Sequence, residues 1–149
     1  MRIRLSVSGE KYDSVKTFLE EHGVEISDEA EYMISESSRY AAFLSLRDDR
    51  RERVRLSVDE VIFIEAFGKD VEVHTEQGTY WSQDRMYQLE ELLDPARFLR
   101  VSKSVIISGR HVKKIRPSLS MKYILTMTNG MLVDVTRSYY TEFRKYFGI

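Results

Sequence analysis

Apolar and polar residues alternate in short runs over much of the chain, the pattern of strands that bury one face. The pattern changes at residues 10–22, where apolar side chains fall at helical spacing and Gly23 ends the run. With strands expected at 2–7, 31–35 and 40–47, residues 1–54 are predicted to form a small β-α-β-β unit. A unit of about 50 residues buries too little apolar surface to be very stable alone.

Residues 55–149 are predicted to form a second, larger domain. Two helices accompany its strands. One is expected at 83–93, after a Ser82 cap, and the other closes the chain at 138–147. Asn129-Gly130 is the strongest short hairpin signal in the chain. The predicted fold class is mainly β (α+β overall), with an antiparallel β domain after the small unit. The strands expected in and just before this domain are 54–57, 61–66, 70–75, 79–82, 98–101, 105–107, 112–115, 122–128 and 132–136.

Composition narrows the chemistry and the compartment. The chain has no cysteine, so it can form neither disulfides nor thiolates, in keeping with a reducing compartment. No apolar run approaches the roughly 20 residues of a membrane span. The first residues also lack the apolar core of a signal peptide. We therefore expect a soluble, cytoplasmic protein.

Charge is distributed unevenly, although the net charge is only −1. Residues 97–149 hold 11 Lys and Arg against 2 Asp and Glu, a balance of +9. Residues 55–96 balance at −7 and residues 1–54 at −3. A basic segment in a near-neutral protein is typical of a surface that binds a polyanion. Ordinary solvated charge is the alternative interpretation.

The residues that enzymes use for catalysis form no recognisable constellation. His22, His74 and His111 share no metal-ligand spacing with one another or with a pair of carboxylates. The phosphate-binding, dinucleotide-binding and nucleophile-elbow motifs are absent from the sequence. We therefore predict that the protein is not an enzyme and that it uses no metal or cofactor.

Three segments of the larger domain place a basic residue in a turn or at a strand end, among small polar residues. Lys69, Lys103 and Arg137 are those basic residues. Ser and Thr hydroxyls suit phosphate contacts, whereas a long cation can reach guanine O6 and N7 in the major groove. Together with the basic tail, these segments indicate DNA binding.

Residues 55–149 resemble the LytTR DNA-binding domain of bacterial transcription regulators. The most specific segments are Phe98-x-Arg100-Val101-x-x-Ser104 and the terminal Arg137-Ser138-Tyr139. The resemblance implies an antiparallel β domain that inserts loops, instead of a helix, into successive major grooves. It also implies that Lys69, Lys103 and Arg137 face bases. The other DNA-binding residues expected, mainly at phosphates, are Arg100, Ser102, Ser104, Lys113, Lys114, Thr136 and Ser138.

The function that these observations favour is a transcription regulator that binds double-stranded DNA sequence-specifically, as a homodimer on DNA. Members of this family often carry a receiver domain, which needs about 120 residues, so residues 1–54 must serve another purpose. We expect dimerisation or packing against the DNA-binding domain, or a site for a regulatory membrane or sensor protein. Two alternatives stay open: a protein or peptide interaction module, and a single-stranded nucleic-acid binder that stacks bases on aromatic residues. The candidates for such stacking are Tyr80, Trp81 and Tyr140.

Overall fold

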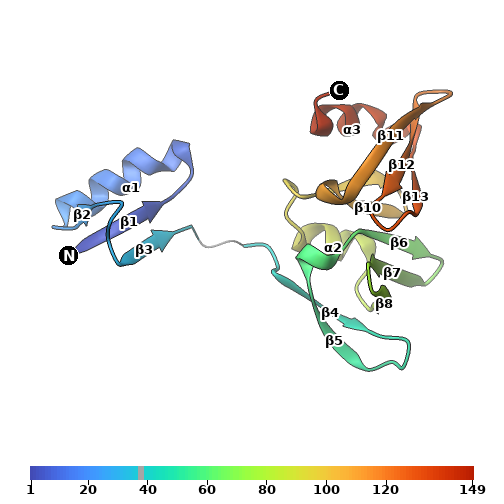
Figure 1. The fold of residues 1–149 in the computed structure, drawn as a ribbon, viewed down its shortest axis with the longest axis horizontal. Helices are drawn as coiled ribbons and strands as arrows, with labels where there is room; N and C mark the ends of the chain where they lie inside the picture. Colours follow the sequence, from blue (N-terminus) through green and yellow to red (C-terminus); the bar gives the residue numbers. More distant parts are fainter. Residues whose placement is uncertain (37–38) are drawn as a thin grey trace. The chain divides into compact units, whose positions relative to one another are not determined.

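A computed structural model describes residues 1–36 and 39–149, which divide into the units Met1–Arg39 and Tyr40–Ile149 (Figure 1). Strands dominate the second unit, and every strand pair in its sheets is antiparallel. The mainly β, α+β fold class predicted from the alternation of apolar residues is confirmed.

The first unit contains a three-stranded sheet and one helix. Its elements are β1 (Arg2–Ser6), α1 (Gly9–Glu21), β2 (Glu25–Ile26) and β3 (Tyr32–Ser35). Both β2 and β3 pair in parallel with β1, which gives the strand order β2-β1-β3. Ile3 is buried at 3% exposure, but no residue of α1 is buried. The unit therefore has a very small core of its own.

The strand expected at residues 40–47 belongs to the second unit. It forms β4 (Phe43–Arg47), which pairs with β5 (Arg53–Ser57) over five residues. Leu44, Leu46 and Leu56 point from this hairpin into the core of the second unit. The chain therefore divides after residue 39, whereas the expected boundary after residue 54 falls inside β5.

Two sheets make up the second unit. The larger has the order β5-β4-β8-β7-β6-β10-β9, and the smaller has the order β11-β12-β13. β4 joins β8 through the single residue pair Arg47 and Trp81, and Figure 1 shows the β4–β5 hairpin projecting at the lower end of the unit. The further strands are β6 (Phe63–Phe67), β7 (Asp70–Thr75), β8 (Gly78–Ser82), β9 (Phe98–Ser102), β10 (Val105–Ser108), β11 (Val112–Ser118), β12 (Lys122–Met127) and β13 (Leu132–Val135).

Two α-helices and three single 3-10 turns complete the second unit. They are η1 (Val58–Glu60), α2 (Met86–Leu92), η2 (Gly109–His111), η3 (Arg137–Tyr139) and α3 (Tyr140–Phe147). The helix expected from residue 83 begins later, because the Ser82 hydroxyl accepts the N–H of Asp84 at 3.0 Å and shapes a turn. The side chain of Gln88 instead accepts the N–H of Arg85, at 2.8 Å, at the start of α2.

The strands β6, β9 and β10 of the larger sheet have a core on each face. On one face they share a core with the β4–β5 hairpin and α2, through residues such as Leu46, Ile64 and Leu89. The other face packs against the smaller sheet and α3, through residues such as Phe63 and Phe143. A strand with a core on each side has little freedom to shift, so the turns at its end are held by rigid elements.

Candidate nucleic-acid interface

Two of the three predicted turns lie side by side at one end of the larger sheet. β6 and β10 are neighbours, and Glu65 lies opposite Val105 in their register. The backbone N–H of Ala66 donates to the carbonyl of Ser104 at 2.8 Å. This bond ties the β6–β7 turn, which carries Lys69, to the β9–β10 turn, which carries Lys103.

The third predicted segment joins them from the smaller sheet. The backbone N–H of Thr136, just after β13, donates to the carbonyl of Val101 near the end of β9, at 3.0 Å. Arg137 then begins η3. The structure thus brings together three segments that lie far apart in the sequence. We call the surface formed by residues 67–70, 102–105 and 136–138 the loop edge.

Each segment of the loop edge presents one exposed basic side chain: Lys69, Lys103 and Arg137. None of the three has an ion-pair partner among the described residues. In particular, Arg137 pairs with neither Asp134 nor Glu142, the nearby carboxylates that would give it a purely structural role. Three unpaired cations at one edge suit an anionic ligand that spans all three turns.

The hydroxyl residues at the loop edge mostly stabilise its backbone. Ser102 is buried, and its Oγ accepts the N–H of Ser104 at 3.2 Å inside the β9–β10 turn. Thr136 is half-buried, and its Oγ1 donates to the carbonyl of Val101 at 3.4 Å. Ser104 is also half-buried, so Ser138 is the most accessible of the four predicted phosphate contacts.

Arg100 points into the β9–β10 turn. Its side chain is 21% exposed and forms an ion pair with Glu90 of α2, with 2.7 Å between Nη1 and Oε2. It also donates to the carbonyls of Ser102 and Lys103. In this arrangement its guanidinium contacts the protein, although the sequence alone suggested a contact with DNA.

Lys113 and Lys114 are exposed but lie farther along the smaller sheet. Lys114 is level with Thr126 of β12, whereas Arg137 follows Val135, which is level with Tyr123. Three residues along a strand span about 10 Å. The two lysines therefore lie outside the loop edge and can meet only a ligand that extends beyond it.

A group of titratable side chains lies on β6 and β7, the two strands that the β6–β7 turn connects. Glu65 and Glu72 are cross-strand neighbours, and burial first and the Glu72 charge second raise the pKa of Glu65. His74 is buried and stacks on Phe63 at 4.3 Å between ring centroids. Burial lowers the pKa of His74, although the carboxylate of Glu72, 3.5 Å from Nε2, opposes that shift.

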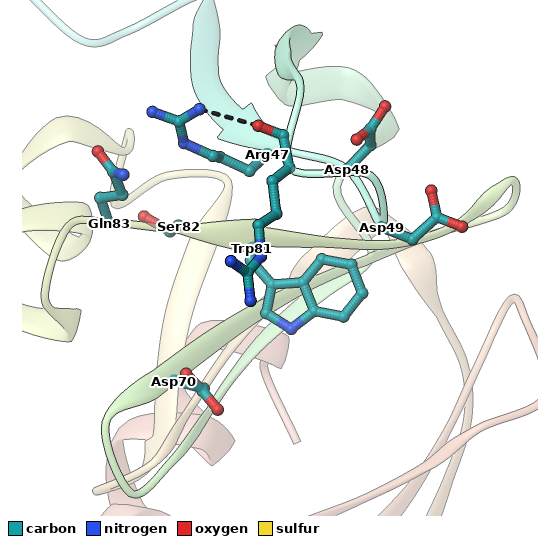
Figure 2. Close-up of a pocket in the computed structure, with 8 residues that line it drawn as sticks. Arg47, Asp48, Asp49, Asp70, Trp81, Ser82 and Gln83 are labelled. Atoms are coloured by element: carbon teal, nitrogen blue, oxygen red, sulfur yellow. Dashed lines mark hydrogen bonds between the residues drawn. The ribbon is translucent and has the colours of Figure 1, made fainter.

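One cavity, of about 450 Å³, lies at the junction of the β4–β5 turn and β8 (Figure 2). Trp81 lines it together with Arg47, Asp49 and Asp70, and Trp81 is half-buried there. Asp48 also lines it, but one oxygen of its carboxylate accepts the backbone N–H groups of the turn it begins. Three aspartates and two arginines line this cavity, so it offers no continuous basic surface to a polyanion.

Neither a metal centre nor a membrane span was found in the part of the chain that the structure describes. No group of three or more His, Cys, Asp or Glu side chains among residues 1–36 and 39–149 is placed to hold a metal ion. Over the same residues, no helix has the length and apolar character needed to cross a bilayer.

The LytTr DNA-binding domain family matches residues 51–148. The chain belongs to this family. The resemblance inferred from the Phe98–Ser104 and Arg137–Tyr139 segments is thereby confirmed, and residues 51–148 form a DNA-binding domain. A solved LytTr DNA-binding domain from Bacillus cereus superposes with a TM-score of 0.69 at 28% sequence identity. The match covers 73% of this chain and 99% of that one.

Two curated relatives resemble part of the chain. The sensory transduction protein LytT of Bacillus anthracis is 32% identical over 92 residues, which are 62% of this chain and 37% of the relative. The transcriptional regulatory protein LytR of Staphylococcus aureus (strain MW2) is 30% identical over 77 residues, or 52% of this chain and 31% of the relative. The matched part thus spans about a third of each relative.

Proposed function

We propose that this protein is a transcription regulator that binds duplex DNA sequence-specifically, with the loop edge inserted into the major groove. The observation that carries the proposal is the convergence of Lys69, Lys103 and Arg137, exposed and without ion-pair partners among the described residues, on three hydrogen-bonded turns. Membership in a DNA-binding domain family and the likeness to LytT and LytR support it.

The roles proposed for individual residues follow from the charge and the donor geometry of each side chain. Arg137 is suited to bidentate contact with guanine, because its guanidinium carries donors in a planar fork. Lys69 and Lys103 are compact charges that can reach base edges or the phosphates beside them. Ser138, the most accessible hydroxyl of the loop edge, and the half-buried Ser104 are suited to phosphate contacts, and Lys113 and Lys114 extend the basic surface along β11.

We further propose that the protein acts as a homodimer on DNA, in the cytoplasm. Three base-reading side chains specify too few base pairs for genomic selectivity, so two copies on spaced half-sites are needed. The first unit is suited to join the two copies. Its own core is so small that the unit would gain stability by packing against a second copy. Its edge strand β3 also exposes Tyr32, Met33 and Ile34 by 63%, 53% and 41%. A regulatory membrane or sensor protein is the other candidate for this surface.

Selection of bound sequences from a random duplex pool tests the proposal. The full chain should enrich a short motif that recurs in two copies at a fixed spacing. Recovery of duplexes without any shared motif would contradict sequence-specific binding. A single unrepeated motif would contradict the dimer but leave the reading of sequence in place.

A further inference from the structure

The Arg100 side chain binds the backbone of the β9–β10 turn. Its Nε donates to the carbonyl of Ser102 at 2.9 Å, and its Nη2 donates to the carbonyl of Lys103. Its Nη1 donates to the Glu90 carboxylate at 2.7 Å. Each of the three guanidinium nitrogens therefore donates to a partner within the protein, so the guanidinium is held against the turn.

The two carbonyls that Arg100 binds belong to the peptide groups on either side of Lys103. Fixing both peptide planes fixes the backbone dihedrals of Lys103 and so the direction in which its side chain leaves the turn. Arginine suits this task because its planar fork is preorganised, whereas a lysine ammonium presents a single point. Glu90 completes the arrangement by anchoring the guanidinium to α2, a helix whose Met86 and Leu89 are buried in the core.

We propose that Arg100 and Glu90 are positioning residues for sequence recognition: they set the direction of Lys103 without contacting DNA. The inference rests on the proposed function, because it takes Lys103 as a base-reading residue. It assigns to Arg100 a role different from the phosphate contact that its residue type suggests. It also gives α2, which lies outside the loop edge, a part in specificity.

The experiment measures the affinity of the full chain for its selected duplex and for a scrambled duplex over a series of salt concentrations. Glu90→Gln should reduce the ratio of the two affinities about threefold, since an exposed ion pair contributes modestly. Arg100→Gln should reduce that ratio about tenfold, because it removes hydrogen bonds from a charged donor. Arg100→Lys should behave like Arg100→Gln, since it keeps the charge but loses the fork. Glu91→Gln, an exposed neighbour on the same helix, is the matched control and should leave the ratio unchanged.

A phosphate contact by Arg100 predicts a different set of results. Arg100→Gln would then weaken both duplexes equally and lower the salt slope by about 0.9. Arg100→Lys would keep most of the affinity, and Glu90→Gln would strengthen binding to both duplexes by releasing the guanidinium. Any of these three results overturns the inference.

Hydrogen exchange in the free protein separates failure of this inference from failure of the proposed function. The Ser104 amide donates to Ser102 Oγ inside the turn, so its exchange rate reports how firmly the turn is held. Glu90→Gln should accelerate that exchange several-fold, and Glu91→Gln should not. Unchanged exchange in Glu90→Gln overturns the positioning role. A wild-type chain that shows no preference between duplexes contradicts the proposed function, whatever the exchange shows.

Discussion

The backbone N–H of Thr136 donates to the carbonyl of Val101 at 3.0 Å, and this bond joins the end of the smaller sheet to the end of β9. Thirty-five residues separate the two along the chain. The bond fixes where η3 begins, and therefore where Arg137 leaves the backbone relative to Lys103. The loop edge is thus formed by the meeting of two sheets, with each of its three exposed cations near the end of a strand packed in the core.

The β4–β5 hairpin should prove essential to the second unit. Leu46 is 2% exposed in the core that β4 shares with α2 and the larger sheet. Leu46→Ala should lower the free energy of unfolding by about 2–5 kcal/mol, the range for a buried leucine that leaves a cavity. Urea denaturation followed by fluorescence of Trp81, the single tryptophan, measures this unit alone.

The control is Ser45→Ala, at the exposed neighbouring position, which should change the free energy of unfolding by no more than about 0.5 kcal/mol. A loss below about 1 kcal/mol for Leu46→Ala would place β4 outside the core.

Stability should fall as the solution is acidified through the range just below neutral pH. Burial holds the pKa of His74 below its ordinary 6.5, so the unfolded chain binds a proton there that the folded chain does not. The free energy of unfolding therefore decreases as pH drops below 6.5. Glu65 has the opposite effect on the free energy of unfolding at lower pH. Because its pKa is raised, the folded chain binds a proton at pH values above 4.5, where the unfolded chain does not.

Urea denaturation at pH 7.5 and at pH 5.5 measures the effect of His74. His74→Gln should reduce the loss of stability between the two pH values. His22→Gln, which replaces an exposed histidine of the first unit, should leave the loss unchanged. An equal loss in wild type and His74→Gln would show that other groups cause it.

Self-association should depend on the first unit. Sedimentation of the full chain with a duplex that carries two half-sites should give two protein copies per duplex, bound cooperatively. A fragment of residues 40–149 keeps Leu44 and Leu46 in its core, so it should fold and still bind one half-site. If that fragment occupies paired half-sites as cooperatively as the full chain, the first unit is not the dimerising element.

Most of the secondary structure could be predicted because the alternation of apolar residues is a local property. The β12–β13 hairpin, for example, follows from Asn129-Gly130. The partner of a strand is not a local property. The run at 40–47 alternates in the same way whichever sheet it joins, so its place beside β5 and β8 was missed.

The sequence predicted which residues lie at the loop edge, but not which of them hold its turns together. Lys69, Lys103 and Arg137 stand in turns, and turns at strand ends are exposed. Arg100 and Ser102 have the same residue types as phosphate contacts, but their hydrogen bonds end on carbonyls and amides of the turn itself. Composition cannot distinguish these two uses, because a turn carbonyl and a phosphate oxygen accept the same donors.

Binding should weaken steeply with salt. If three to seven cations, among them exposed residues such as Lys69, Lys103, Lys113, Lys114 and Arg116, meet phosphates, log K should fall against log salt with a slope of about −3 to −6 per monomer. Lys113→Gln should reduce the magnitude of the slope by about 0.9 and affect all duplexes alike. A slope near zero would exclude the phosphate backbone as the main source of affinity.

Titration of Arg137→Ala against the selected duplex and a scrambled duplex shows whether the loop edge reads sequence. A guanidinium bidentate to guanine provides roughly 1–3 kcal/mol of discrimination. Arg137→Ala should therefore weaken the selected site about tenfold to a hundredfold and remove the preference at one base pair. Lys113→Ala is the control, and it should weaken both duplexes by the same smaller factor. Equal losses on both duplexes for Arg137→Ala would contradict the account, because Arg137 would then have no part in reading sequence.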